Sequence, residues 1–543
     1  MKRNLFALVL TIGLLAQAFG QTVVRITPAE KKLAAGITAK QLSDYLYFVA
    51  SDAMGGRDTP SQGLDATAEF IRMNLSRWGF KPAGDNGTFF QKIALKSETI
   101  DPANNLLQIN GTTYTLGDDF LRVAGNGSAN ALMVFGGNGW MVKAKSIDPY
   151  KGLDVKGKVV VLYTEGFPNR TTLTRMPAGV TQADLTGTKG TDWADPITYA
   201  AQSGASGILV VASPQLQDAW PQARRAYGRA SVYPEKLRES SGTAVSNVPV
   251  MVVSSRVGDA LFAGAEGSKD SATSFAINKT VSMTSLSKAE TKWTQNVVGL
   301  WEGRDPVLKK EMVAIGAHYD HVGTNPNAPG EDKIWNGADD DGSGTVAVLS
   351  IAEALAKSKV RPKRSILFVW HCGEEKGLWG SEYFNKFPTV DIKSVVAQLN
   401  IDMIGRSKKP GDANPRNKDL TGEREIYVIG SEMMSSTLGD IIKGSNNGYL
   451  KLGYDYRYDD PKDTNRFFFR SDHFNYALNG IPITFWFDGV HEDYHQPGDE
   501  PQKIDYDKME RVARTIFLTM WEVSDLAQRP KIDKQLPSEL TQR

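Results

Sequence analysis

The sequence predicts an α/β protein with a mixed, mostly parallel sheet flanked by helices, and a β-rich domain inserted into it. From about residue 291, short apolar runs alternate with amphipathic helical patterns, which is typical of a sheet covered by helices on both faces. Residues 110–290 are instead rich in Gly, Ser and Thr and contain short β runs. The length of 543 residues is too great for one ordinary core.

Residues 1–20 have the composition of a signal peptide. Two basic residues precede an apolar run over 5–15, which is too short to span a bilayer, and Ala18 and Gly20 place small residues before a cleavage site at Gln21. We therefore expect an exported protein, periplasmic or extracellular, without stable membrane insertion. The net charge of +1 gives no electrostatic reason to expect nucleic acid as a partner.

Residues 22–110 predict a helical beginning. Two stretches repeat apolar residues at i, i+3, i+4 and i+7, which is the period of an amphipathic helix. These residues are Leu42, Tyr45, Leu46 and Val49 in the first stretch, and Leu64, Ala68, Ile71 and Leu75 in the second.

The middle of the chain predicts short strands at 132–135, 158–163, 207–212 and 249–253, with one short helix near 195–202. Residues 266–290 are polar and weakly patterned, so we expect a return linker there. None of the six histidines falls between 110 and 290, which argues against a histidine-ligated metal in this region.

The last part of the chain predicts the α/β sheet. Strands are expected at 312–317, 366–371, 395–400, 426–429 and 483–487, and helices at 344–357 and 506–527. In sheets of this kind, functional sites gather at the carboxyl ends of the strands. All six histidines lie between 318 and 495, so the search for a site begins at these strand ends.

A histidine stands at the end of the first of these strands. His318 directly follows 312–317, and Asp320 comes two residues later. A histidine in this place can ligate a metal, while the acid can hold the other ring nitrogen.

Three adjacent acids occupy a glycine-rich loop at 337–344, before the helix at 344–357. Asp339, Asp340 and Asp341 repel one another unless they are solvated or bound to cations. One interpretation is an exposed loop with a helix-capping aspartate. The other is a tight loop that turns one carboxylate inward.

Two further strands are followed by acids. Glu374 and Glu375 come just after 366–371, where one can ligate a metal and the other can accept a proton, although a solvated pair is the simpler alternative. Asp402 ends an apolar strand, and an unpaired carboxylate there is costly. A metal removes that cost, and so does a salt bridge to Arg406.

The last strand is followed by two candidate histidines, of which His495 is the better ligand because a Pro-Gly turn follows it, whereas His491 fits an ordinary loop histidine. The single cysteine, Cys372, lies in an apolar run and is expected to be a buried residue rather than a nucleophile. Two histidines and three acids suit zinc, and also cobalt or manganese, and five ligands suit two ions better than one.

Six short motifs of the chain, in their order and approximate spacing, resemble those of the M28 family of zinc peptidases over about 240 residues. The N-terminal Gly56-Arg57 and Phe90-Gln91 also resemble the family's lead-in, and 153–158 resembles part of the protease-associated domain that many members carry. The six motifs are Gly316-Ala317-His318-Tyr319-Asp320, the loop 337–344, Gly373-Glu374-Glu375, the run 402–405, Ser471-Asp472-His473 and Tyr494-His495.

The resemblance implies a division of the chain. It gives a signal peptide at 1–20, the N-terminal part of the peptidase domain at 21–110 and an inserted protease-associated domain at 111–290. The zinc peptidase domain, with its zinc-peptidase/phosphorylase-like fold, follows at 291–530, and a C-terminal tail occupies 531–543.

The resemblance also implies a role for each site residue. The metal ligands would be His318, Asp340, Asp402, Glu375 and His495, with Asp340 bridging two zinc ions because it stands two residues before Gly-Ser-Gly. Glu374 would be the general base, and Asp320 would orient His318.

The implied activity is hydrolysis of peptide bonds in a peptide or protein substrate, most simply by an aminopeptidase. One alternative is an exopeptidase or dipeptidase similar to glutamate carboxypeptidase, although its arginine-rich substrate patch is not found here. Another is a glutaminyl cyclase with one zinc; the animal cyclases usually have Trp where this chain has Tyr494. A receptor-like module that has lost its metal ligands is the third, but this chain keeps them all.

Overall fold

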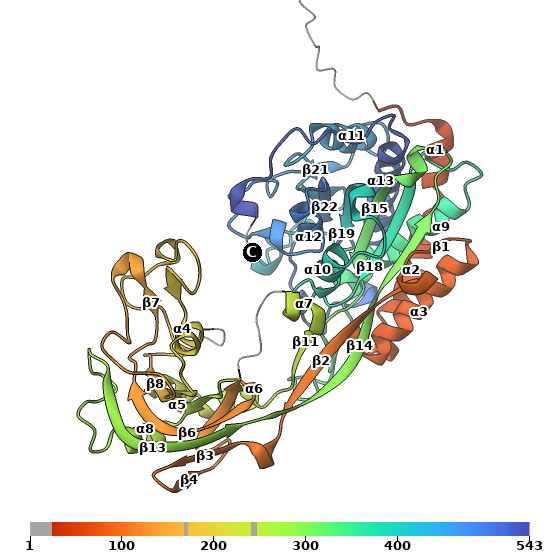
Figure 1. The fold of residues 1–543 in the computed structure, drawn as a ribbon. Coiled ribbons are helices and arrows are strands. Elements are labelled where there is room, and N and C mark those ends of the chain that lie inside the picture. The colour runs from red at the N-terminus through yellow and green to blue at the C-terminus, as the bar shows by residue number, and fades with distance from the viewer. Residues whose placement is uncertain (1–23, 168–171, 241–246, 542–543) are drawn as a thin grey trace, which may run out of the picture. The chain divides into compact units, whose positions relative to one another are not determined.

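The computed structural model describes residues 24–167, 172–240 and 247–541, so the expected signal peptide at 1–20 lies outside the described residues. The chain divides into two compact units (Figure 1). The first unit is Met1–Ile93 with Trp293–Arg543, and the second is Ala94–Lys292. The chain passes between them within two long strands, β2 (Phe90–Ile100) and β14 (Ser287–Trp301).

The sheet of the first unit is mixed and mostly parallel, as predicted. Its centre is four parallel strands in the order β18 (Ser365–His371), β15 (Met312–His318), β19 (Val395–Ile401) and β22 (Ile483–Phe487). Outside them, β14 pairs antiparallel with β18 and β20 (Glu425–Ile429) antiparallel with β22, while β21 (Gly453–Asp455) follows β20. Every residue of the four central strands is buried, which explains their nearly continuous apolar sequence.

Helices pack on this sheet in two groups. In the first, α9 (Gly344–Ala356) and α13 (Tyr506–Asp525) contact the central strands, and α2 (Ala39–Val49) packs against both helices. In the second, α10 (Trp379–Lys386) and α12 (His473–Leu478) contact each other and the strands. The remaining helices of the unit are α1 (Pro28–Ala34), α3 (Gln62–Arg77) and α11 (Ser436–Asn447).

The second unit is β-rich and has an eight-stranded sheet of its own. In spatial order its strands are β4 (Thr112–Tyr114), β3 (Leu106–Ile109), β13 (Phe275–Ser285), β6 (Gly127–Phe135), β8 (Val159–Tyr163), β10 (Gly207–Val211), β12 (Val250–Val253) and β5 (Phe120–Ala124). Successive residues of β8 enter two different apolar clusters, since Val161 belongs to one and Val160 to the other. Both faces of the sheet are therefore covered, and the four predicted strands of this region are confirmed.

The predicted linker at 266–290 is wrong, because β13 lies within it and pairs with both β3 and β6. Its inward residues Ile277, Val281 and Met283 are buried. The register shifts between Ile277 and Thr280, and this bulge interrupts the two-residue period that would otherwise have identified a strand.

Two further predictions are wrong in part. The α-helices of this stretch end with α3, and the strands β1 (Lys81–Pro82), β2 and β3 follow within 22–110. The second unit has five described helices in place of the single one expected. They are α4 (Pro196–Gln202), which is the predicted one, α5 (Pro214–Asp218), α6 (Trp220–Tyr227), α7 (Glu235–Ser240) and α8 (Ser255–Phe262). All are eight residues long or shorter, and so they carry little periodic signal.

No helix in the described part of the chain combines the length and the apolar character that crossing a bilayer requires.

Replacing Leu46 by Ala is expected to destabilise the first unit by about 2–5 kcal/mol, because a fully buried leucine leaves a cavity. Its Cδ1 lies so close to Gly342 that a Cβ there would approach within 2.7 Å, so the cavity would open beside the acidic loop. Hydrogen exchange of peptides from α9 measures the loss. Leu478→Ala is the control, because Leu478 is 47% exposed and its loss should change exchange little. Equal effects of the two variants would contradict this packing.

Candidate metal centre

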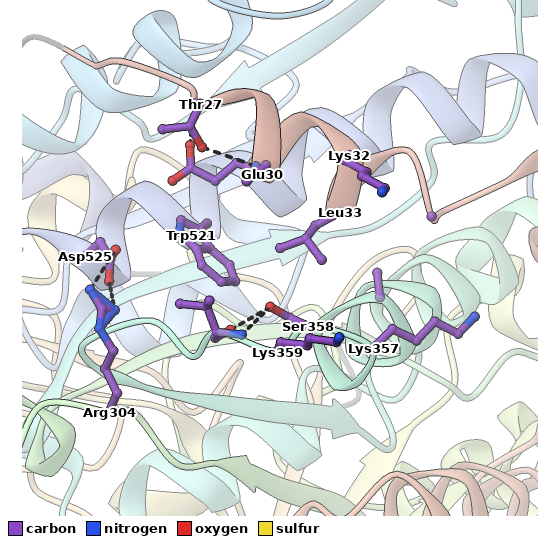
Figure 2. Close-up of a pocket in the computed structure, with 14 residues that line it drawn as sticks. Thr27, Glu30, Lys32, Leu33, Arg304, Lys357, Ser358, Lys359, Trp521 and Asp525 are labelled. Atoms are coloured by element: carbon purple, nitrogen blue, oxygen red, sulfur yellow. Dashed lines mark hydrogen bonds and ion pairs between the residues drawn. The ribbon is translucent and has the colours of Figure 1, made fainter.

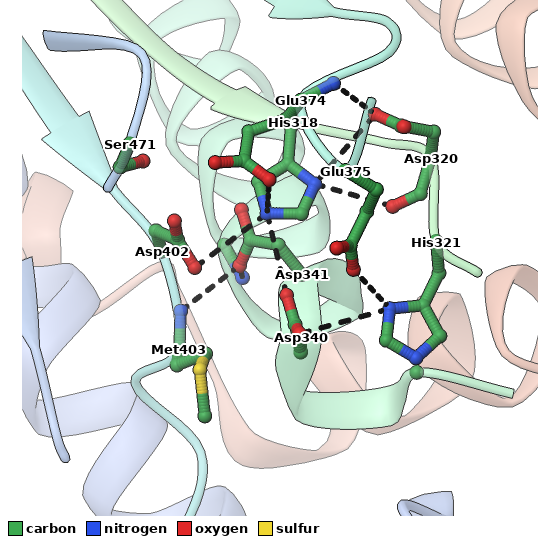
Figure 3. Close-up of polar contacts among 12 residues, drawn as sticks. His318, Asp320, His321, Asp340, Asp341, Glu374, Glu375, Asp402, Met403 and Ser471 are labelled. Atoms are coloured by element: carbon green, nitrogen blue, oxygen red, sulfur yellow. Dashed lines mark hydrogen bonds and ion pairs between the residues drawn. The ribbon is translucent and has the colours of Figure 1, made fainter. Parts of the chain in front are cut away.

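Loops at the carboxyl ends of the central strands bring the candidate ligands together, as Figure 3 shows for most of them. Within this cluster, two groups of side chains each hold their ligand atoms within 4.8 Å of one another. One group is His318, Asp340 and Asp402, and the other is His321, Asp340, Glu375 and His495.

The first group surrounds the ring of His318, which ends β15. Its Nε2 lies 3.3 Å from Asp340 Oδ1 and 3.6 Å from Asp402 Oδ1. Asp402 comes directly after β19, the parallel neighbour of β15, so strand pairing itself sets these two residues side by side.

The second group uses the other oxygen of the same aspartate. His495 Nε2 lies 3.0 Å from Asp340 Oδ2 and 3.0 Å from Glu375 Oε2. His321 Nδ1 lies 2.8 Å from Glu375 Oε1. The structure thus brings the five sequence-predicted ligands together and adds His321, which the sequence reasoning missed although it stands only three residues after His318.

The three adjacent aspartates are all buried, which rules out the exposed-loop interpretation. Asp339 accepts a hydrogen bond from the Gly405 N–H at 2.7 Å, and Asp341 accepts one from the Gly344 N–H at 2.8 Å. Each neighbour therefore has backbone partners of its own, and Asp340 alone of the three belongs to the ligand groups. Asp341 also holds the start of α9, so a capping role and an inward carboxylate coexist in one loop.

A buried arginine joins this loop to the N-terminal segment. Arg57 is fully buried and donates hydrogen bonds to the carbonyl oxygens of Tyr319, Asn336 and Gly337 at 2.9, 2.7 and 2.9 Å. It therefore supports both the His318–His321 turn and the entry to the acidic loop. Sequence reasoning noted Arg57 as part of a motif but assigned it no contact.

Asp320 is buried beside His318, but the closer partner of His318 Nδ1 is the main-chain oxygen of Asp320 at 3.2 Å, whereas the carboxylate Oδ1 lies 3.7 Å away. That carboxylate instead accepts a hydrogen bond from the Glu374 N–H at 3.1 Å. Asp320 thus contacts both the ligand His318 and the residue predicted to be the general base. Glu374 Oε2 lies 3.9 Å from His318 Nε2.

Burial and the neighbouring charges shift the pKa values of several groups in the cluster. Burial alone would lower the pKa of His318, but the charges of Asp402 and Glu374 raise it well above its usual value. Burial acts in the same way on His495, whose contacts with Asp340 and Glu375 raise its pKa to about 10. Burial raises the pKa values of Glu374 and Asp402. Without metal, His495 therefore holds a proton at neutral pH.

The donor set fits zinc. His318 Nε2, His495 Nε2, Asp340 Oδ2 and Glu375 Oε1 are buried, and none makes a hydrogen bond of good geometry. Buried polar atoms without partners are costly and rare, so several that converge on one place indicate a bound ion. Imidazole nitrogens mixed with carboxylate oxygens are ligands that zinc prefers.

The structure distinguishes between the interpretations that the sequence left open for Arg406, His491 and Cys372. Arg406 forms its ion pair with Asp493 at 2.8 Å and thus does not neutralise Asp402. His491 is buried rather than an open loop residue, and its Nε2 lies 3.3 Å from Asp339 Oδ2. Cys372 is a buried free thiol whose pKa burial raises, as expected for a packed residue.

A narrow cavity leads to the cluster. Asp340, Glu374 and Asp402 line its polar end. The other lining residues are mostly apolar or aromatic: Met403, Phe467, Arg470, Phe485, Phe487, Val490 and Tyr494.

A larger cavity of about 560 Å³ lies elsewhere in the first unit, between α1 and the ends of α9 and α13 (Figure 2). Its lining includes Trp521 and several charged residues but none of the two ligand groups, so the smaller cavity is the one that serves the site.

A family comparison agrees with this geometry. Residues 296–520 match the model of Peptidase family M28. The matched segment contains all the residues of both ligand groups.

Several curated relatives are similar to part of the chain. "Leupeptin-inactivating enzyme 1" of Streptomyces exfoliatus is 29% identical over 209 residues, which is 38% of each chain. A "Probable leucine aminopeptidase" of Arthroderma benhamiae is 28% identical over 40% of this chain and 56% of its own length. "Leucine aminopeptidase 1" of Sclerotinia sclerotiorum is 31% identical over 41% of this chain and 54% of its own length. The chain thus spans about half or less of the length of these relatives.

Among solved structures, an aminopeptidase from Aneurinibacillus sp. strain AM-1 aligns with a TM-score of 0.49 and 17% identity, over 93% of this chain and 98% of that one. A zinc aminopeptidase of Bacillus subtilis aligns with a TM-score of 0.44 and 15% identity, over 92% of this chain and 98% of that one.

Zinc affinity is expected to rise with pH between about 6 and 8, because metal must displace a proton from His495, whose pKa its contacts with Asp340 and Glu375 raise to about 10, and competes with the proton that the nearby carboxylates favour on His318. Titration calorimetry in buffers of different ionisation enthalpy measures the protons released. His495→Gln should release about one proton fewer. Equal proton release by the variant and the natural protein would contradict the placement of His495 at the metal.

Proposed function

We propose that this chain is a zinc metallopeptidase of the aminopeptidase type that binds two zinc ions. The observation that carries the proposal is the sharing of Asp340 between the two ligand groups. Its Oδ1 lies 3.3 Å from His318 Nε2, and its Oδ2 lies 3.0 Å from His495 Nε2. One carboxylate with a separate set of partners on each oxygen fits a bridging ligand of a two-metal hydrolase.

Glu374 has the position and environment of the general base. It lines the cavity beside Asp340 and Asp402, and burial raises its pKa toward the range in which a carboxylate takes up a proton readily. In the proposed reaction Glu374 accepts a proton from the attacking water and then delivers it to the leaving amine. Bound zinc would supply positive charge to polarise the scissile carbonyl and to stabilise the oxyanion.

Other residues hold Glu374 in place. The Asp320 carboxylate accepts the Glu374 N–H, so the base is tied to the same turn that carries His318. The Gly373 N–H donates to Thr59 Oγ1 at 3.1 Å, and Gly373 has a positive φ of 68°. The chain thus turns sharply after β18, which places Glu374 and Glu375 at the centre of the cluster.

The choice of the amino end rests on the relatives, several of which are named leucine aminopeptidases. The aromatic and apolar lining of the cavity suits an apolar side chain of the substrate. Arg470 favours the rival carboxypeptidase, because it is the one cation among the residues that line the cavity and a carboxylate would pair with it.

We propose further that the second unit is a protease-associated domain, on the support of its β-rich sheet and the 153–158 motif that leads into β8. Export through the N-terminal segment also remains a proposal. Identification of the first residue of the mature secreted protein tests it, with Gln21 expected.

Free aminoacyl reporter compounds with apolar residues should be cleaved, and N-acetylated peptides should not be. Activity should disappear with a chelator and return with zinc, because the metal polarises the carbonyl. Product analysis by mass spectrometry identifies the end that is cut. Cleavage of N-acetylated peptides but not of free ones would refute the aminopeptidase assignment, and cyclisation of N-terminal glutamine would favour the cyclase.

Glu374→Gln should retain zinc and lose about 10²–10⁴ in kcat, because it keeps the shape of the side chain but cannot accept the proton. Metal analysis and steady-state kinetics check both statements. The neighbouring Glu375→Gln is the matched variant and should lose zinc affinity, since Glu375 belongs to the ligand group. Near-normal turnover by Glu374→Gln would exclude Glu374 as the base.

A further inference from the structure

The mechanism proposed above makes no use of His321, although this histidine belongs to the second ligand group. Its side chain is fully buried. Its Nδ1 lies 2.8 Å from Glu375 Oε1 and 3.7 Å from Asp340 Oδ2, and its ring stands edge-on to that of His495 with 5.6 Å between the centroids. Figure 3 shows the Nδ1 side of the ring turned toward Glu375 and Asp340.

The surrounding backbone is shaped around this ring. The His321 N–H donates to the carbonyl oxygen of Arg57 at 3.2 Å, and the Arg57 guanidinium donates to Gly337. A Cβ at Gly337 would lie 2.5 Å from His321 Cγ and Cδ2, and Gly337 has a positive φ of 55°. Glycine at this position thus lets the acidic loop close against the His321 ring and fixes it beside Asp340.

The close approach of His321 and Glu375 is not an ordinary hydrogen bond. Both atoms of the 2.8 Å contact, His321 Nδ1 and Glu375 Oε1, are buried without a hydrogen-bond partner of good geometry. His495 Nε2 and Asp340 Oδ2 are also buried without a hydrogen-bond partner of good geometry. The four residues form one group in which the ligand atoms all lie within 4.8 Å of one another, as the ligands of a single ion do.

We propose that His321 Nδ1 is a fourth protein ligand of the ion held by Asp340, Glu375 and His495. The inference rests on the proposed zinc pair and makes that pair unequal. The ion at His318, Asp340 and Asp402 has three protein ligands and keeps an open position, as catalytic zinc does. The other ion has four and is closed by the protein, as structural zinc is.

The asymmetry has a functional consequence. Glu374, the proposed base, lies 3.9 Å from His318 Nε2, on the side of the three-ligand ion. The ion that acts with the base is therefore the one that is held less tightly and exchanges more readily. The His321 ion serves mainly to hold Asp340, Glu375 and His495 in place.

Zinc K-edge absorption of the fully loaded natural protein tests the ligand count. Three imidazoles shared by two zinc ions are expected with His321 as a ligand, and two without it. His321→Phe keeps a ring against Gly337 but removes the nitrogen. In titrations against a competing chelator, one of its two zinc sites should weaken by more than the about 10–100-fold that loss of an outer partner of a ligand costs.

His473→Phe is the matched control, because His473 is also a fully buried histidine whose ring nitrogens lack a hydrogen-bond partner of good geometry, but it belongs to neither group. It should keep both zinc ions and all three imidazoles. Two imidazoles in the natural protein would overturn the proposal, even with weaker binding by His321→Phe, since His321 would then only position Glu375. A natural protein that binds no zinc would instead refute the proposed function itself.

Discussion

A concentration of buried carboxylates at the carboxyl edge of the first unit's sheet is the constraint on which the rest of the site depends. The buried Asp339, Asp340, Asp341 and Asp402 and the partly buried Glu374 are crowded around the ends of parallel strands. Their mutual repulsion and desolvation are costly unless positive charge lies among them. The arrangement of histidines, arginines and lysines around this edge follows from that cost.

Protein cations neutralise the outer part of this cluster. His491 faces Asp339, and Arg406 pairs with Asp493 at 2.8 Å and lies 3.7 Å from Asp499. Asp499 in turn accepts the backbone N–H groups of Asp339 and Asp340 at 3.0–3.1 Å, so the neutralised outer groups hold the acidic loop in position. The carboxylates of the two ligand groups lie beside histidines, and bound metal ions would provide further positive charge there.

Arg57 adds a mechanical link between the N-terminal segment and this edge. Burial lowers its pKa to about 10, while the nearby charges of Asp320 and Asp341 oppose the shift, so the guanidinium stays charged at neutral pH. Because it bonds three carbonyl oxygens of the His318–His321 turn and the acidic loop, the two sides of the second ligand group share one support. The residues before the second unit thus help to support the candidate metal centre.

The sequence by itself determined the α/β class, the central strands, α9 and α13, and the strand-end positions of His318, Glu375 and Asp402. Continuous apolar runs and long amphipathic helices are local patterns, and parallel strands must end at the same edge. Only the tertiary structure decided the strand at 275–285, whose bulge breaks its period, and the separate partners of the three aspartates. It also decided the place of His321. The position of its ring beside the acidic loop depends on contacts with Gly337 and Arg57, which are distant in the sequence, and no local spacing encodes these contacts.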